Sequence, residues 1–274
     1  MSQTLNIRHV TRYNYDDAPA YGLQQLRLSP LDGPSQRVID WDVSVEGGTV
    51  QSVSTDEHGN RVHLVRLGSD GDSLIVTSAG MVEVGDVNGV IGPHTDVAPL
   101  WLYLRNTPLT EASLGLSKLL EDLQDGDAPS RLHNLSRRIR DRVAYTVGAT
   151  TAETTADGAL QLGQGVCQDH SHIFIAAARA LGHPARYVSG YLSMDDRVDQ
   201  DATHAWAEAH VDGLGWVGFD ISNGHSPDTR YVRIATALDY AGAAPISGSL
   251  RGGTNEQIAV ELRVAQGVSQ SIQQ

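Results

Sequence analysis

The chain has 274 residues, of which 40% are hydrophobic and 19% are charged, a composition typical of a folded protein and not of a disordered or fibrous one. Its formal net charge of −13 argues against binding to a nucleic acid backbone, which needs a cationic surface. We therefore expect no nucleic acid partner, and the length leaves room for two domains.

The N-terminus lacks the apolar core of a signal peptide, and the sequence contains no run of about 18 apolar residues. We therefore expect a cytoplasmic location and no membrane association. Cys167 is the single cysteine, so an intramolecular disulfide cannot form and the thiol needs another explanation.

Residues 1–90 predict an all-β N-terminal domain that resembles a sandwich. Trp41, Val43 and Val45 alternate with polar residues, a pattern typical of a half-buried strand. Further strands are predicted at 5–15, 23–28, 61–67, 73–78 and 81–84. Short strands at this spacing are typical of a β-sandwich or barrel. Residues 91–104 follow as a connector.

Residues 105–274 predict a second domain in which helices come before strands. Leucines at helical spacing indicate a helix within 116–123, and a second helix, capped by Ser130, has an apolar face up to residue 143. A third helix is expected over 167–181. Strands are then predicted at 186–192, 203–211, 215–221 and 257–264. Helices followed by antiparallel strands form an α+β arrangement.

Cys167 lies in the segment GQGVCQDHSH, at the predicted start of the third helix. A thiol at this position faces unpaired backbone N–H groups and the positive end of the helix dipole, and both favour the thiolate. The thiolate is the form of cysteine that acts as a nucleophile. An inert buried thiol is the alternative, and a neighbouring base would decide between them.

The segment THAWAEAHV alternates strictly, so His204 and Trp206 share one strand face while alanines occupy the other. If residues 212–214 form the next turn, Trp206 lies opposite Asp220 and His204 is its diagonal neighbour. Diagonal side chains are close enough for an imidazole to meet a carboxylate. Cys167, His204 and Asp220 therefore predict a nucleophile, a base and an orienting carboxylate, with a structural histidine as the alternative for His204.

Three segments, GVCQDHSHIFIAAARALGHPARYVSGYL, HAWAEAHV and GWVGFDISNG, resemble in this order the core blocks of the bacterial transglutaminase-like superfamily. Residues 1 to about 85 resemble the N-terminal region of many bacterial members, through HVTRYNY, LRLSP and DEHGN. The resemblance implies a papain-like core of helices packed on an antiparallel sheet. It also implies Cys167 as nucleophile, His204 as base and acid, and Asp220 as orienting residue. The position after Asp220 departs from the family, in which proline often follows.

An oxyanion intermediate would need the Cys167 backbone N–H and one more donor. Candidates for this donor or for substrate contacts are Gln164, Tyr145, Trp101, Trp206 and Asp169. Asp169 has a simpler interpretation, in which it accepts hydrogen bonds from free N–H groups at the helix start. His170 and His172 lack the spacing of a zinc site with Cys167, so we expect no metal and no cofactor.

These residues predict a cysteine protease or amidase that hydrolyses an amide, peptide or isopeptide bond through a thioester on Cys167. Its substrate would be a peptide, an isopeptide or a protein. A transamidase shares every step up to the acyl-enzyme and differs only in whether an amine or water attacks it. A non-catalytic binding or assembly module of the same fold is the alternative from a different class. The sequence also permits a homo-oligomer.

Overall fold

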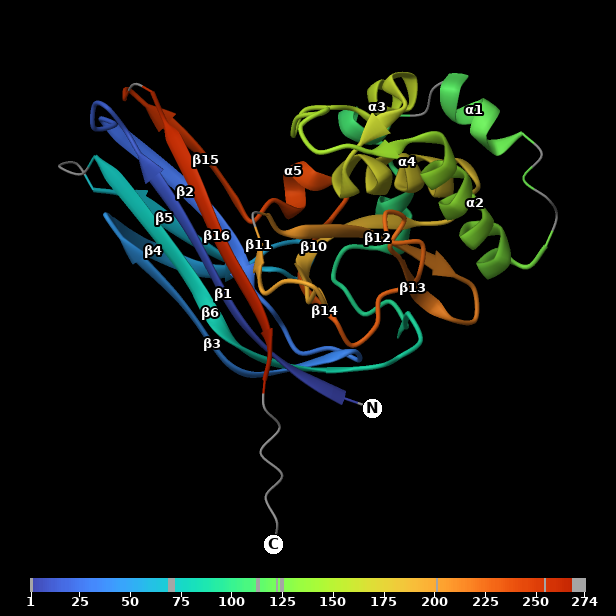
Figure 1. Cartoon of the computed structure of the whole chain (residues 1–274), viewed down its shortest axis with the longest axis horizontal. Coiled ribbons are helices and arrows are strands. Elements are labelled where there is room, and N and C mark those ends of the chain that lie inside the picture. Colours follow the sequence, from blue (N-terminus) through green and yellow to red (C-terminus); the bar gives the residue numbers. More distant parts are fainter. Residues whose placement is uncertain are drawn as a thin grey trace, which may run out of the picture.

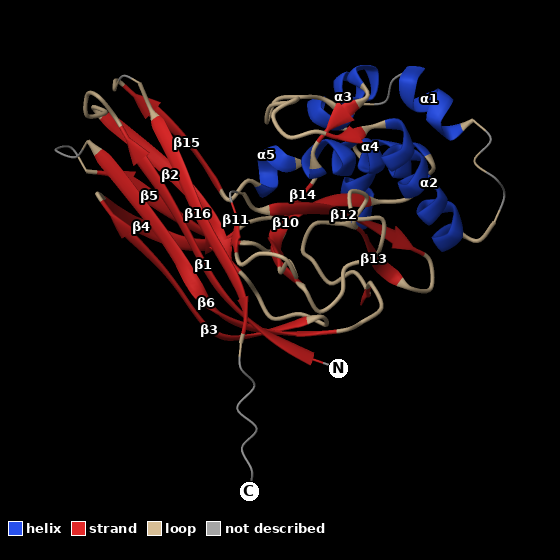
Figure 2. Cartoon of the chain, in the orientation of Figure 1, coloured by secondary structure: helices blue, strands red, loops and turns tan. Residues whose placement is uncertain are grey.

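The structure, a computed structural model, describes residues 2–68, 72–111, 114–121, 123, 126–200, 202–253 and 255–267. Figure 1 shows a β-sandwich beside a second sheet, and in Figure 2 the helices gather on one side of that second sheet. The α+β class predicted from the sequence is confirmed. Within the described ranges, no helix has both the length and the apolar composition to cross a lipid bilayer.

The sandwich consists of a five-stranded sheet in the order β11-β16-β1-β6-β3 and a four-stranded sheet in the order β15-β2-β5-β4. The strands are β1 (Ser2–Asn14), β2 (Tyr21–Ser29), β3 (Gln36–Glu46), β4 (Gly48–Thr55), β5 (Arg61–Leu67), β6 (Ser73–Gly85), β11 (Asp199–Gln200), β15 (Ile246–Arg251) and β16 (Gln257–Gln266). Alternating apolar residues such as Leu26, Val65 and Leu74 form a buried core between the two sheets.

Strand β6 runs through a region where the sequence predicted two strands, 73–78 and 81–84. Ala79 and Gly80 lie between the two predicted strands. The glycine has a packing role, since a Cβ at Gly80 would lie 2.1 Å from the Asp40 carbonyl oxygen. Glycine therefore allows β3 and β6 to approach closely, and the strand continues through it.

The C-terminal strands belong to the sandwich and not to the second sheet. β16 pairs with β1 from Leu5↔Gln266 to Asn14↔Gln257, and β15 pairs with β2. The predicted second domain, 105–274, therefore differs from the sheet pairing, in which the chain returns to the sandwich briefly at β11 and again at β15 and β16. Alternation along 257–264 predicts a strand but not its partner, because pairing depends on residues far away in the sequence.

The second sheet is antiparallel, with the order β14-β10-β12-β13-β7. Its strands are β7 (Val90–Gly92), β10 (Ala185–Leu192), β12 (His204–Val211), β13 (Gly215–Phe219) and β14 (Tyr231–Ala237). Strand β7 begins at the end of the predicted all-β domain and ends in the predicted connector. Glu208 pairs with Gly218 and Ala207 with Phe219. This is the register that the predicted turn at 212–214 requires, and its next pair would be Trp206 and Asp220.

Helices cover one face of the second sheet. The helices and short elements are η1 (Leu100–Leu104), η2 (Pro108–Thr110), α1 (Leu114–Leu120), α2 (Ala128–Arg142), β8 (Ala144–Tyr145), α3 (Ala156–Leu162), β9 (Gln164–Gly165), α4 (Cys167–Ala180) and α5 (Tyr240–Ala243). Residues 173–178 of α4 share a buried core with Ala205, Ala207 and Ala209 of β12. The small alanine side chains let the helix approach the sheet, as the alternation of THAWAEAHV predicted.

Helix α2 begins earlier than the sequence predicted. Asp127 is its N-cap, and its Oδ1 accepts a hydrogen bond of 2.8 Å from the Ser130 backbone N–H. The predicted cap, Ser130, therefore lies inside the first turn, together with Pro129. Proline fits there because the first turn has no intrahelical acceptor for its missing N–H.

The sandwich packs against β10 and β14 of the second sheet, and the two share a core. One cluster of buried apolar residues contains Leu5 and Val82 of the sandwich together with Tyr191 and Val232 of the second sheet. Asn60, from the DEHGN segment, adds two hydrogen bonds to the Thr236 backbone, of 2.7 and 2.8 Å. The second sheet is thus covered by helices on one face and is joined to the sandwich at β10 and β14.

This shared core predicts that a cavity on β16 destabilises the whole chain. Leu262 is 2% exposed, whereas Ile258 on the same strand is 55% exposed. Leu262→Ala should lower the free energy of unfolding by about 2–5 kcal/mol, and the control Ile258→Ala should change it by about 0.5 kcal/mol or less. Urea denaturation followed by circular dichroism and tryptophan fluorescence measures both. Equal effects of the two variants would contradict the shared core.

Candidate active site

Cys167 is the first residue of α4, and a buried carboxylate organises the turn that leads to it. Asp169 is 1% exposed, and its Oδ2 accepts hydrogen bonds from the Val166 backbone N–H at 2.8 Å and the Thr150 hydroxyl at 2.7 Å. A Cβ at Gly165 would lie 2.7 Å from the Asp169 Cβ, so the turn needs glycine there. Asp169 therefore accepts a hydrogen bond from a backbone N–H at the start of the helix, which is the simpler of the two roles considered for it.

His204 bridges the other two residues predicted for catalysis. Its Nε2 lies 2.6 Å from Asp220 Oδ2, and its ring lies close enough to the Cys167 side chain for the two groups to interact electrostatically. Because Nε2 faces Asp220, Nδ1 is the nitrogen left for the thiol. His204 and Asp220 are buried, and Cys167 is partly exposed. The structure thus joins Cys167, His204 and Asp220 in one line of contacts.

The environment of the histidine and the aspartate favours their charged forms. Burial by itself lowers the pKa of His204, but the hydrogen bond to Asp220 and the interaction with Cys167 outweigh it and raise that pKa above its ordinary value. Burial by itself raises the pKa of Asp220, but the hydrogen bond from His204, its positive charge and further hydrogen bonds lower that pKa. The two groups therefore form a buried imidazolium and carboxylate pair.

Asn223 and Tyr231 complete the surroundings of Asp220. Neither was identified from the sequence. Asp220 Oδ2 also accepts hydrogen bonds from Asn223 Nδ2 and the Tyr231 hydroxyl, both at 2.7 Å, and Asp220 Oδ1 accepts the Asn223 backbone N–H at 3.1 Å. Asn223 lies in DISNG, three residues after Asp220. Tyr231 begins β14, a strand that the alternation in YVRIATA could have indicated. Both residues stabilise the ionised carboxylate.

Trp206 lies beneath the histidine and not in a substrate cleft. The residue is 2% exposed, and its ring stacks with that of His204 at a centroid distance of 6.2 Å and an interplanar angle of 28°. Its ring also contacts that of Tyr231 edge-on, at a centroid distance of 5.4 Å. The indole therefore shields the imidazole from water and restricts its rotation.

Tyr145 is the candidate oxyanion donor that lies beside the thiol. Its side chain neighbours Cys167, and burial together with that neighbour raises the pKa of Tyr145 to about 12, so the phenol keeps its proton. Pairing of β8 with β9 sets Tyr145 next to Gly165. Gln164 is exposed and Trp101, on η1, is 61% exposed. Neither belongs to the lining of the cleft that contains Tyr145 and His204.

His170 connects α4 to the turn that follows Asp220. Its Nε2 lies 2.9 Å from the Val143 carbonyl oxygen, and its Nδ1 lies 2.8 Å from the Ser222 hydroxyl. A carbonyl only accepts, so we assign the ring proton to Nε2 and the Ser222 hydroxyl as donor to Nδ1. His170 thus serves as a bridge between backbone segments. Among the described residues, no three His, Cys, Asp or Glu side chains gather as metal ligands.

The site opens into a cleft of about 670 Å³. Its lining comes from His204 and from three segments, 145–147, 192–197 and 222–231. The first of these segments begins at the end of β8, and the other two lie at the ends of strands of the second sheet. The walls of the cleft therefore come from different parts of the fold. A cleft of this size can hold a few residues of a peptide.

The sandwich anchors one wall of the cleft. The segment 192–197 leads into β11, where Asp199 pairs with Arg263 and Gln200 with Leu262 of β16. The Gln200 side chain then donates a hydrogen bond of 2.8 Å to the Leu192 carbonyl at the start of the segment. The position of this wall depends on the sandwich as well as on the second sheet.

Known proteins resemble this chain over almost its full length. The family model described as the transglutaminase-like superfamily matches residues 118–221, and that of the bacterial transglutaminase-like N-terminal region matches residues 5–83. An uncharacterized protein of Mycobacterium tuberculosis is 29% identical over 269 residues, 88% of this chain and 86% of the relative. An uncharacterized protein of Mycobacterium leprae is 26% identical over 274 residues, 94% of this chain and 98% of the relative.

A solved structure, named as that of "a Putative Cysteine Protease from Cytophaga hutchinsonii", has the same fold. It superposes with a TM-score of 0.76 at 21% sequence identity and covers 97% of this chain and 91% of its own. The likeness is one of fold, and it covers both the sandwich and the helix-covered sheet.

The charged pair predicts a window of pH in which Asp220 stabilises the fold most. The raised pKa of His204 gives stability that is complete below about pH 6.5 and is lost as the pH rises through the folded value. The lowered pKa of Asp220 gives stability that is complete above about pH 4 and is lost as the pH falls through the folded value. Asp220→Asn should therefore cost most between about pH 4 and 6.5, by about 1.5–3 kcal/mol.

Urea denaturation across pH 2–10 of the wild type and Asp220→Asn measures this difference, at roughly one-unit steps. Asp199→Asn is the matched control, because Asp199 is an exposed carboxylate of the same chain. A cost of Asp220→Asn that stays constant over the whole range would show that the pair is not ionised in the folded protein.

Proposed function

The chain belongs to the transglutaminase-like superfamily, and on that basis we propose that it is a thiol-dependent hydrolase of an amide, peptide or isopeptide bond. The observation that carries the proposal is the 2.6 Å contact of His204 with Asp220, beside Cys167 at the start of α4. A nucleophile, a base and a group that orients the base are the parts that covalent acyl transfer requires.

The first step is activation of the thiol. The Cys167 proton resides on His204 Nδ1 before substrate binds, so the site holds a thiolate beside an imidazolium. Asp220 stabilises the imidazolium through Nε2, and the unpaired N–H groups and positive dipole end of α4 stabilise the thiolate. Substrate then meets a nucleophile that already carries its charge.

In the second step the thiolate attacks the carbonyl carbon, and the carbonyl oxygen becomes negative. The backbone N–H of Cys167 lies in the first turn of α4, where N–H groups lack intrahelical acceptors. The Tyr145 hydroxyl, beside the thiol and protonated, supplies the second hydrogen bond. Both donors are present before substrate binds, so the site needs little reorganisation.

In the third step the imidazolium of His204 gives its proton to the leaving amine as the C–N bond breaks. A thioester on Cys167 remains. Water then attacks the thioester while His204 accepts a proton, and the C–S bond breaks to release a carboxylic acid and return the thiol. The open cleft and the half-exposed side chain of Tyr145 leave a path for water, which favours hydrolysis over transfer to an amine.

A library of peptides and isopeptides, incubated with the protein with and without glycine ethyl ester as an amine, tests the reaction. We expect new carboxylic acids by mass spectrometry, and we expect Cys167→Ala to abolish them because nothing else in the site can form the acyl intermediate. Circular dichroism confirms that the variant is folded. Amine-coupled products in place of acids would make the protein a transamidase, and absence of turnover would make it a binding module.

Tyr231 is proposed as a positioning residue that acts through Asp220. Tyr231→Phe removes one hydrogen bond to a buried carboxylate, which is worth about 1.5–3 kcal/mol. We expect kcat/KM to fall about tenfold or more and the pKa of His204, measured by NMR, to shift. Tyr191→Phe is the matched control, since the Tyr191 hydroxyl is buried on the adjacent strand but bonds His9 instead. Equal His204 titrations in the two variants would remove Tyr231 from the mechanism.

A further inference from the structure

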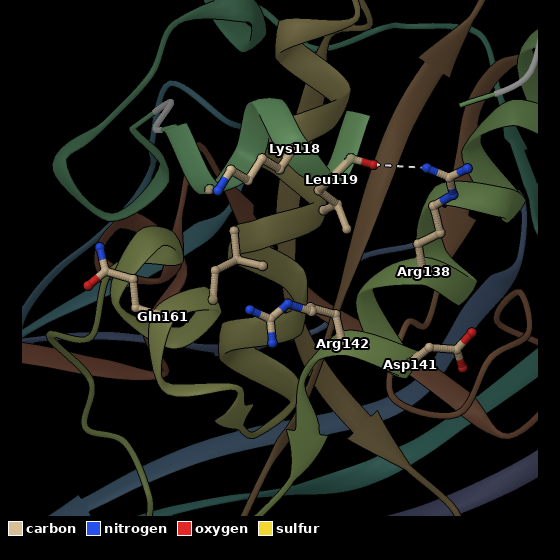
Figure 3. A pocket seen from close by; sticks show the side chains of 8 residues that line it. Lys118, Leu119, Arg138, Asp141, Arg142 and Gln161 are labelled. Carbon is tan, nitrogen blue, oxygen red and sulfur yellow. Dashed lines mark hydrogen bonds between the residues drawn. The ribbon is translucent and has the colours of Figure 1, made fainter. Parts of the chain in front are cut away.

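A second pocket, of about 460 Å³, lies between α1, α2 and α3. Figure 3 shows it from close by, with side chains from all three helices around it. Its lining has no residue in common with the cleft at Tyr145 and His204. The proposed reaction does not use it, so its chemistry needs a separate explanation.

The pocket carries positive charge in an acidic protein. The chain has a net charge of −13, yet α2 holds five arginines and a single acidic residue, Asp141. Lys118 of α1, which is the chain's single lysine, adds one more cation to the pocket. Charge gathered on one face produces a local potential that the net charge of the molecule does not reveal.

Two of these cations are available to a ligand. Within the described part of the chain, Lys118 and Arg142 take part in no hydrogen bond or ion pair with another side chain. Figure 3 shows both side chains extending toward the same side of the pocket. Arg138 has a different role, because its Nη1 donates to the backbone oxygens of Leu119 and Glu121, at 3.3 and 2.6 Å.

The floor of the pocket is apolar. Leu160 is 4% exposed and Leu119 is partly buried against the helical core, and both line the pocket beside the two cations. A bare anion would satisfy Lys118 and Arg142 but would leave these leucines in contact with water. An anion on an apolar body would satisfy both halves of the surface.

We propose that this pocket binds a small carboxylate with an apolar body. The carboxylate would accept hydrogen bonds from the planar guanidinium of Arg142, in the fork geometry that carboxylates favour, and from the Lys118 ammonium. The apolar body would lie on Leu119 and Leu160. Asp141, next to Arg142 in the lining, disfavours a second negative charge on the ligand, which distinguishes a carboxylate from a phosphate.

Calorimetric titration of the full chain with sodium octanoate tests the proposal. Octanoate should bind more tightly than inorganic phosphate and than octylamine, which keeps the alkyl chain but reverses the charge. Arg142→Gln and Lys118→Gln should each weaken octanoate binding about tenfold, the loss expected for a charged hydrogen bond. Circular dichroism checks that each variant is folded.

Arg137→Gln is the matched control. Arg137 lies on the same helix, and replacing it by glutamine removes the same positive charge. Its side chain donates a hydrogen bond to Asn134 and does not line the pocket. Octanoate affinity should be nearly unchanged in this variant. A loss equal to that of Arg142→Gln would show a general effect of charge and would overturn the proposed site, as would phosphate or octylamine binding as tightly as octanoate.

The single lysine allows a second measurement that does not depend on a variant. Acetylation of the wild type by a neutral amine-reactive ester, followed by mass spectrometry, reports Lys118 and the N-terminal amine separately. Octanoate should slow acetylation of Lys118 several-fold and leave the N-terminal amine unaffected. Equal rates at Lys118 with and without octanoate would overturn the proposal even if the hydrolase activity is confirmed.

Discussion

One oxygen atom, Asp220 Oδ2, accepts hydrogen bonds from His204, Asn223 and Tyr231, and the candidate active site depends on it. These donors come from β12, from the turn after β13 and from β14. A buried carboxylate is costly unless its lone pairs are satisfied, so the three segments must meet at this point for the fold to tolerate the charge. The same requirement orients the imidazole toward Cys167.

The position of β14 in turn depends on the sandwich. Val232 and Ile234 of β14 lie in the core that β1, β6 and β16 complete, and β16 also pairs with β11 at the end of the cleft wall. The sandwich therefore helps to position Asp220 and the wall of the cleft, and it is not an independently packed domain.

Charge is distributed in two ways on the same molecule. At the cleft, Arg230 pairs with Asp228 at 2.6 Å and Arg197 with Asp196 at 3.0 Å, so cations and carboxylates lie together. On α2, arginines follow one another with a single acidic neighbour. The net charge of −13 excludes a broad cationic surface, but it carries no information on a local one, because potentials near a surface are set by the closest charges.

The sequence by itself determined the α+β class and the line of Cys167, His204 and Asp220. Strand alternation and the length of one turn are local properties, and they specified the register that brings His204 to Asp220. Tertiary structure decided that Tyr231 completes the carboxylate's contacts, that Tyr145 is the aromatic candidate beside the thiol, and that β15 and β16 return to the sandwich. Those contacts join residues far apart in the chain, and the packing of whole surfaces selects them, which no local periodicity encodes.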